Sequence, residues 1–257
     1  MEFIDFYATL AGFFFALLIL WSGVGAGILV IPALITLFNV DPLVAIASGS
    51  TYAFVAKIIM TLGHYKRGYI DWKAAYIFLR ICLPVTLISA ALLAYLSKSE
   101  PDISLQLYLI IAIILAGCIA LAALLSDRIK MIVSKWPLSS LSGTTGVLMG
   151  LTGVGGGVLV IPALATRGGL AIKVAIATSI PIGLILSLAV SLTLGSSGLV
   201  DYQLVISLLI GATVATPIGT RLFHLFPENL IKRVTCALIA IALMDLVNKA
   251  TDLSLNL

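Results

Sequence analysis

Two glycine-rich runs carry residue types that could bind an anion. The first reads GVGAG from Gly23 to Gly27 and follows Ser22, and the second reads GVGGG from Gly153 to Gly157 and follows Thr152. Glycine lets the backbone approach a ligand closely, and a helix that starts after such a run presents free N–H groups and the positive end of its dipole. We therefore expect both runs to line an anion site.

Small hydroxyl residues add hydrogen-bonding capacity in two further segments, 48–51 and 178–179, which lie at equivalent distances after the two runs. Hydroxyl groups and backbone N–H groups together suit an oxyanion. An alternative is that Gly, Ser and Thr only allow close helix packing, which is common in membranes. The predicted substrate-binding residues are Ser22, Gly23, Gly25, Gly27, Ser48, Gly49, Ser50, Thr51, Lys57, Thr152, Gly153, Gly155, Gly156, Gly157, Thr178 and Ser179.

Lys57 is the strongest single candidate for a counter-charge to the anion. It lies nine residues before Lys66, so along a helix it would sit roughly 14 Å inward of that charged end. An ionised side chain at such depth is expensive and marks a functional site. The alternatives are a lysine that reaches the membrane surface through its long stem, or one that pairs with Asp71 or another flanking carboxylate.

A duplication relates the two groups of candidate residues. Residues 22–34 match residues 152–164 at ten of thirteen positions, and the offset of 130 continues without a gap through 45–47 and 175–177. We expect repeats over residues 1–130 and 131–257 that together form one transport domain, because a single duplication inside a membrane protein is typical of transporters. The alternative is a duplication that serves packing alone.

Composition places the chain in a membrane. Hydrophobic residues make up 61% of the 257 residues and charged residues 10%, and mean hydropathy is +1.20. These values exclude a soluble globule, a disordered chain, a disulfide scaffold and a nucleic-acid binder. The three cysteines, Cys82, Cys118 and Cys236, lie in apolar runs without metal-ligand spacing, so we predict no metal site, no cofactor and no nucleic-acid partner.

Apolar runs predict six ordinary spans and two longer blocks. The spans are 42–63, 74–96, 104–125, 172–194, 204–223 and 229–247. The blocks, 3–38 and 137–166, would measure roughly 54 and 45 Å as single helices against a hydrocarbon core of about 30 Å. Each is interrupted by a glycine run, so each should hold two short helices around an unwound loop, with the second helices starting at Ile28 and Val158.

The basic residues favour one of two topologies. If each block crosses the membrane once, eight crossings divide the flanking Lys and Arg seven against six. If each block is a re-entrant hairpin, six crossings remain and the division is eleven against two. The second division obeys the positive-inside rule, so we predict inverted repeats with three crossings each and both termini outside. The eleven are Lys66, Arg67, Lys73, Arg128, Lys130, Lys135, Arg167, Lys173, Arg221, Lys232 and Arg233, and the two are Lys98 and Lys249.

The duplicated pattern GxGxG[IV]LxxPxL followed by A-x-A-[ST] resembles the TauE/SafE family over nearly the whole chain. The resemblance implies a multi-pass permease of a prokaryotic inner membrane that carries sulfite, organosulfonates or other small sulfur-containing anions, commonly described with seven or eight predicted spans. The first run has Ala26 where the second has Gly156, so the two loops need not contribute equally to anion binding.

These observations predict an all-α polytopic membrane protein of two inverted repeats, each a glycine-broken helix pair plus three transmembrane helices. The expected partners are a small inorganic or organosulfur anion and the lipid bilayer, and a homo-oligomer is compatible with the sequence. We expect export by alternating access and no enzymatic activity. The alternatives are an anion channel, a structural membrane subunit, or an intramembrane hydrolase using Ser22 with His64 or His224, which lie far from the glycine runs.

Overall fold

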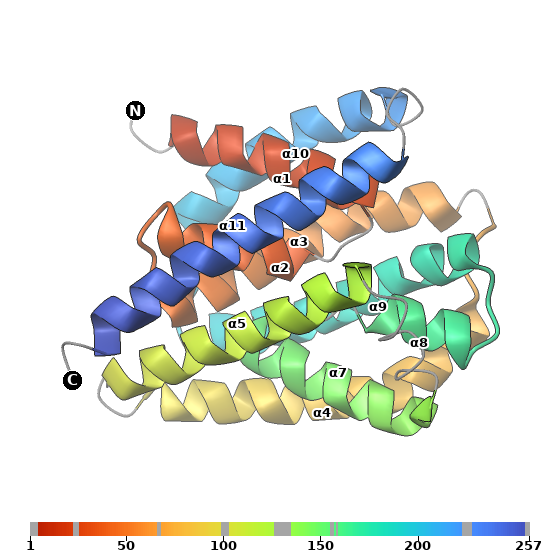
Figure 1. Cartoon of the computed structure of the whole chain (residues 1–257), viewed down its shortest axis with the longest axis horizontal. Helices are drawn as coiled ribbons and strands as arrows, with labels where there is room; N and C mark the ends of the chain where they lie inside the picture. The colour runs from red at the N-terminus through yellow and green to blue at the C-terminus, as the bar shows by residue number, and fades with distance from the viewer. Residues whose placement is uncertain are drawn as a thin grey trace.

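The computed structural model describes residues 5–22, 26–65, 68–98, 103–125, 135–154, 157, 159–222 and 228–254. Within these ranges the chain is helical and contains no strand. The helices are α1 (Phe6–Ser22), α2 (Ala26–Thr36), α3 (Pro42–Tyr65), α4 (Trp72–Leu96), α5 (Ile103–Leu125), α7 (Leu138–Thr152), α8 (Val160–Thr166), α9 (Ile172–Gly195), α10 (Tyr202–Leu222) and α11 (Glu228–Ser254) (Figure 1).

Six of the described helices are long and apolar enough to cross a membrane: α3, α4, α5, α9, α10 and α11. They correspond to the six spans expected from hydropathy, which confirms an all-helical multi-pass membrane protein. The main difference is at α11, which continues to Ser254 rather than ending at Val247. Its last turns carry Lys249 and Asp252, whose polarity ended the apolar run without ending the helix.

The helix boundaries of the two halves follow the sequence offset. Adding 130 to the bounds of α3, Pro42–Tyr65, gives those of α9, Ile172–Gly195. The start of α4 at Trp72 likewise corresponds to the start of α10 at Tyr202. The order of short and long helices is therefore the same in each half.

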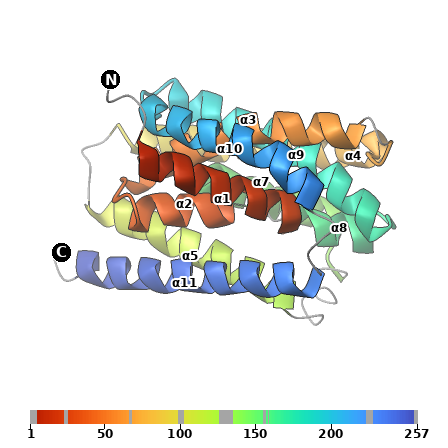
Figure 2. The same ribbon diagram turned by 90° about the horizontal axis from the view of Figure 1, so that it is seen from above.

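The helices lie along a common long axis (Figures 1 and 2). The start of α1 and the ends of α2, α4, α9 and α11 lie at one end, which we call the terminal end. The ends of α3, α8 and α10 lie at the opposite end, which we call the basic end. From their place in or beside the helices, seven basic residues lie near this end: Lys73, Lys135, Arg167, Lys173, Arg221, Lys232 and Arg233.

Each pair of shorter helices starts and finishes at the same end. At the terminal end, the backbone N–H of Asp5 donates to Ser207 Oγ at 3.1 Å and Lys249 Nζ donates to the carbonyl of Ile35 near the end of α2. At the basic end, Arg167 Nε donates to the carbonyl of Trp136 at 3.0 Å, which joins the end of α8 to the start of α7. Both pairs therefore fold back on themselves.

The first helix of each half packs against a helix of the other half. α1 packs against α10, and its counterpart α7 packs against α4. Glycines make the approach of α1 to α10 close: a Cβ at Gly12 would overlap the backbone of Leu208, and one at Gly211 would overlap the carbonyl of Thr9. Close backbone contact of this kind is the usual basis of helix association in lipid.

Gly146 provides a test of this packing within α7. A Cβ there would lie 2.7 Å from the carbonyl oxygen of Cys82 and 2.9 Å from Cβ of Val85. We expect Gly146→Ala to lower the free energy of unfolding by about 1–3 kcal/mol because α4 and α7 must separate. Thermal unfolding in detergent measures the effect.

Gly143 supplies the matched control, since it lies in the same helix and a Cβ there meets nothing within 4 Å. Gly143→Ala should leave the midpoint unchanged or raise it slightly, because alanine has the higher helix propensity. Equal midpoints for the two variants would contradict close packing of α4 on α7.

Two aspartates start equivalent helices, as their place after short loops predicts. Asp71 Oδ1 accepts a hydrogen bond from the N–H of Ala74 at 2.9 Å at the start of α4. Asp201 Oδ1 accepts one from the N–H of Leu204 at 3.0 Å at the start of α10. Both carboxylates therefore cap helices.

Candidate functional site

The two glycine runs meet inside the molecule. Gly27, at the start of α2, lies against the backbone of Gly153, so a Cβ at Gly27 would overlap the Gly153 carbonyl oxygen. Gly153 ends α7 with a left-handed φ of +65°. Segments that are 126 residues apart in sequence are thus in backbone contact, and only glycine at both positions permits it.

The helices after the runs begin at residues other than those expected. α2 begins at Ala26, two residues before Ile28, and α8 begins at Val160, two residues after Val158. Alanine favours a helix more than glycine does, so Ala26 in the first run supports an earlier start than the glycines of the second run allow. The two runs are therefore unequal in structure as well as in sequence.

Ser50 lies at this glycine junction. Its side chain is 1% exposed, and its hydroxyl oxygen has no hydrogen-bond partner among the described residues. A Cβ at Gly153 would lie 3.0 Å from Ser50 Oγ, which places the hydroxyl directly beside the backbone of the second run. A buried hydroxyl without a partner is unfavourable by about 1–3 kcal/mol, which makes Ser50 a candidate for binding another group.

Lys57 is buried in the contact between α3 and α9. Its side chain is 6% exposed, and its ammonium donates to Ser187 Oγ at 3.0 Å and to the carbonyl of Gly183 at 3.2 Å. Among the described residues no carboxylate bonds to it. Asp71 caps α4 instead. In the described part of the chain Lys57 therefore neither reaches the protein surface nor bonds to Asp71.

The hydrogen bonds between α3 and α9 show how these helices cross. Thr51 Oγ1 and Ser191 Oγ lie 2.8 Å apart, and Lys57 contacts Ser187, so the two helices are antiparallel. Ser187 is the residue that the 130-residue offset pairs with Lys57. In two antiparallel helices, residues related by the offset can touch only near the point where the helices cross. Since Lys57 contacts Ser187, Lys57 lies at this crossing point. A second lysine at 187 would place two ammonium groups together, which explains why the halves differ there.

Other predicted hydroxyls hold the two halves together. Ser48 Oγ accepts a hydrogen bond from the N–H of Asp201, and Thr178 Oγ1 accepts one from the N–H of Asp71, both at 2.9 Å. These bonds are equivalent under the offset of 130 and lie toward opposite ends of the molecule. The structure therefore does not bring Ser48 and Thr178 together in one place.

Several remaining candidates are occupied by local contacts. Thr152 Oγ1 donates to the carbonyl of Leu148, Ser179 Oγ donates to that of Ile176, and Gly49 packs against Ile31. Gly23, Gly25, Gly155, Gly156 and the side chain of Ser22 lie outside the described residues, as do His224 and the side chain of His64. Gly157 is described and buried.

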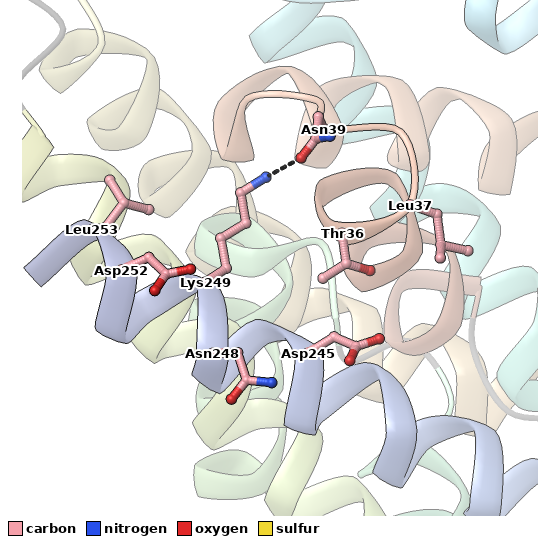
Figure 3. A pocket seen from close by; sticks show the side chains of 8 residues that line it. All are labelled: Thr36, Leu37, Asn39, Asp245, Asn248, Lys249, Asp252 and Leu253. Carbon is pink, nitrogen blue, oxygen red and sulfur yellow. Dashed lines mark hydrogen bonds between the residues drawn. The ribbon is translucent and has the colours of Figure 1, made fainter.

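A polar pocket at the terminal end is separate from the glycine junction. It has a volume of about 420 Å³ and is lined by Thr36, Leu37, Asn39, Asp245, Asn248, Lys249, Asp252 and Leu253 (Figure 3). Lys249 donates to the carbonyl of Ile35 at 2.6 Å and to Asn39 Oδ1 at 3.2 Å. Two aspartates share this pocket with Lys249, whereas no carboxylate in the described part of the chain bonds to Lys57.

The sequence pattern did not identify Gly183, Ser187 or Thr61, although Ser187 is the offset partner of Lys57. Gly183 contributes only its carbonyl, and a carbonyl leaves no side-chain signal. Thr61 has a buried hydroxyl oxygen without a partner one turn after Lys57, as Ser50 has two turns before it. Helical spacing from Lys57 was the signal that could have found it.

Comparison with known proteins shows to which family the chain belongs. Residues 8–246 match the family described as sulfite exporter TauE/SafE. A "probable membrane transporter protein" of Haemophilus influenzae is 30% identical over 195 residues, covering 70% of this chain and 68% of the relative. The "probable membrane transporter protein YjnA" of Bacillus subtilis is 24% identical over 252 residues, covering 93% and 98%. No solved structure matches. With six membrane-length helices in its described part and a family match over nearly its whole length, the chain belongs to the TauE/SafE family of membrane transporters.

Proposed function

We propose that this chain exports a small sulfur-containing anion, sulfite or an organosulfonate, by alternating access. The observation that carries the proposal is Lys57, whose buried ammonium bonds to a hydroxyl and a carbonyl but to no carboxylate among the described residues. An uncompensated charge in the membrane interior is strongly unfavourable. An anion that binds beside it supplies the missing charge.

The glycine junction supports the same position for the anion. Gly27 and Gly153 bring backbone from both halves together next to the unpartnered hydroxyl of Ser50. Ser50 and Lys57 are seven residues apart on α3, so they lie on one face about 10 Å apart along the axis. The centre of α3 lies between them. In repeat transporters the substrate binds near the midplane, where interrupted helices from the two halves meet.

We infer that the repeats are inverted and that the glycine-broken pairs are re-entrant hairpins. The support is that α1 starts and α2 ends at the terminal end, whereas α7 starts and α8 ends at the basic end. Non-helical backbone at membrane depth requires burial in protein, which the contact between the two runs provides. The bonds from Ser48 to Asp201 and from Thr178 to Asp71 are related by the same inversion.

The proposed orientation in a prokaryotic inner membrane follows from the basic residues. With the basic end in the cytoplasm, eleven flanking Lys and Arg lie inside and two outside, and both termini are outside. A divalent anion leaving a negative interior then gains about 4.6 kcal/mol at 100 mV. Export therefore needs no coupling ion.

Transport into liposomes tests the function. Purified protein should move labelled sulfite in a saturable manner under an imposed potential, with sulfoacetate, taurine and sulfate as competitors. Counterflow driven by unlabelled sulfite on the opposite side would distinguish a carrier from a channel. If none of these anions moves or competes, the proposed substrate class is wrong.

Cysteine labelling tests the orientation. In a variant lacking Cys82, Cys118 and Cys236, a cysteine at Ser254 should react with an impermeant thiol reagent added to whole cells, because α11 ends at the terminal end. A cysteine at Lys135, which is exposed near the basic end, should react only after lysis. The reverse pattern would place the basic end outside and contradict the proposed topology.

A further inference from the structure

Three buried hydroxyl oxygens in the described part of the chain have no hydrogen-bond partner: Ser50 Oγ, Thr61 Oγ1 and Thr235 Oγ1. Two of them lie on α3, the helix that carries Lys57, while Thr235 lies on α11. Buried hydroxyls are normally satisfied, so each exception requires an explanation.

Ser50, Lys57 and Thr61 form one row along α3, which we call the α3 polar row. Their spacings of seven and four residues are two turns and about one turn, so all three lie on the same helix face. The row extends about 16 Å along the axis, with Ser50 toward the terminal end and Thr61 toward the basic end. Helical side chains lean toward the N-terminus, so Thr61 leans back toward Lys57.

The repeat explains why Thr61 has no partner. Its equivalent in α9 is Ser191, which bonds to Thr51 across the helix crossing. The corresponding bond on the other side of the crossing would be made by Thr61. Its partner would be the residue equivalent to Thr51, which is Pro181. Proline has no hydroxyl, so the hydrogen bond exists on one side of the crossing only.

The other two members of the row have less polar equivalents in α9. Ile180 stands at the equivalent of Ser50, and Ser187 at the equivalent of Lys57. Both differences leave the greater polarity on α3. The two unpartnered hydroxyls of α3 therefore lie on either side of the Lys57 ammonium rather than in two matching sites.

We propose that Ser50 and Thr61 each donate a hydrogen bond to the oxyanion on the two sides of Lys57, so that the α3 polar row is its path through the protein. This inference rests on the proposed function and names the groups that would recognise the substrate. It requires an anion with several oxygen acceptors, since one oxygen stays at Lys57 while another reaches the next hydroxyl. Sulfite and sulfonate groups have this form.

The test compares Thr61→Val with Thr235→Val in sulfite flux into liposomes. Each replaces a buried, unpartnered threonine hydroxyl by a methyl of similar size, but only Thr61 is in the row. We expect Thr61→Val to raise the half-saturating sulfite concentration roughly tenfold or more, as expected for losing a hydrogen bond to a charged group. Thr235→Val should match the wild type, and Thr61→Ser, which keeps the hydroxyl, should restore it.

The possible failures are distinguishable. If the wild type moves sulfite and Thr61→Val has the same half-saturating concentration as Thr235→Val, the path is wrong while the proposed function stands. If Thr61→Val and Thr61→Ser are equally impaired, the threonine acts through its shape and the path is also wrong. If the wild type moves no sulfite, the proposed function fails and this inference fails with it.

Discussion

Replacing Gly153 by alanine is expected to abolish anion flux and to destabilise the protein. The new methyl would lie 2.5 Å from Cδ1 of Ile31 and 3.0 Å from Ser50 Oγ, and the residue would keep a left-handed φ of +65°. The conformational strain alone is about 1–2 kcal/mol, and overpacking at the junction adds about 1–3 kcal/mol. Sulfite flux and thermal unfolding of the purified variant measure both effects.

Gly169 separates the two causes. It has nearly the same φ, +64°, but a Cβ there meets nothing within 4 Å. Gly169→Ala should therefore show the strain alone and retain flux. If the two alanine variants are equally stable and equally active, Gly153 does not pack closely against Ile31 and Ser50 and the junction is not the anion site.

Much of the fold could be predicted because the membrane imposes simple rules on sequence. Helices such as α4 and α9 must be apolar for about 20 residues, so hydropathy locates them directly. The duplication also predicts helix boundaries, since the bounds of α3 shifted by 130 residues are those of α9. Polar ends such as that of α11 escape this reasoning, because a helix can continue beyond the bilayer, and so do the starts of α2 and α8 beside the glycine runs.

The partners of the candidate residues could not be predicted in the same way. Ser48 and Thr178 had the residue types of an anion site, but their hydroxyls hold the loops before Asp201 and Asp71. Which hydroxyl stays free depends on how α3 crosses α9, and the spacing within one helix does not contain that information. Lys57 was identifiable because its charge is costly at any position in the membrane interior.

Comparison of residues related by the 130-residue offset explains why a duplicated chain has one candidate site. Helices related by the 130-residue offset can carry equivalent hydrogen bonds, such as those of Ser48 and Thr178, without conflict. A charge at the crossing cannot be duplicated, because its copy would lie beside it. Serine in place of lysine at position 187 therefore gives Lys57 a hydrogen-bond acceptor and leaves a single positive charge at the crossing, which the proposed function assigns to one anion.

Lys57→Met is expected to remove anion binding without unfolding the protein. Methionine fills a similar volume but has no charge, so the attraction for the anion is lost. For a buried charge the loss is about 3 kcal/mol or more, which corresponds to roughly 150-fold weaker binding. The anion-free variant should be as stable as the wild type or more stable, because a desolvated and unneutralised charge has been removed.

Thermal unfolding with and without sulfite measures both parts of this expectation. Sulfite should raise the Tm of the wild type and of Lys249→Met, since Lys249 lies in the separate terminal-end pocket and bonds to Ile35 and Asn39. It should not raise the Tm of Lys57→Met. A variant that is destabilised yet still responds to sulfite would show that Lys57 serves the contact of α3 with α9, and that the anion binds elsewhere.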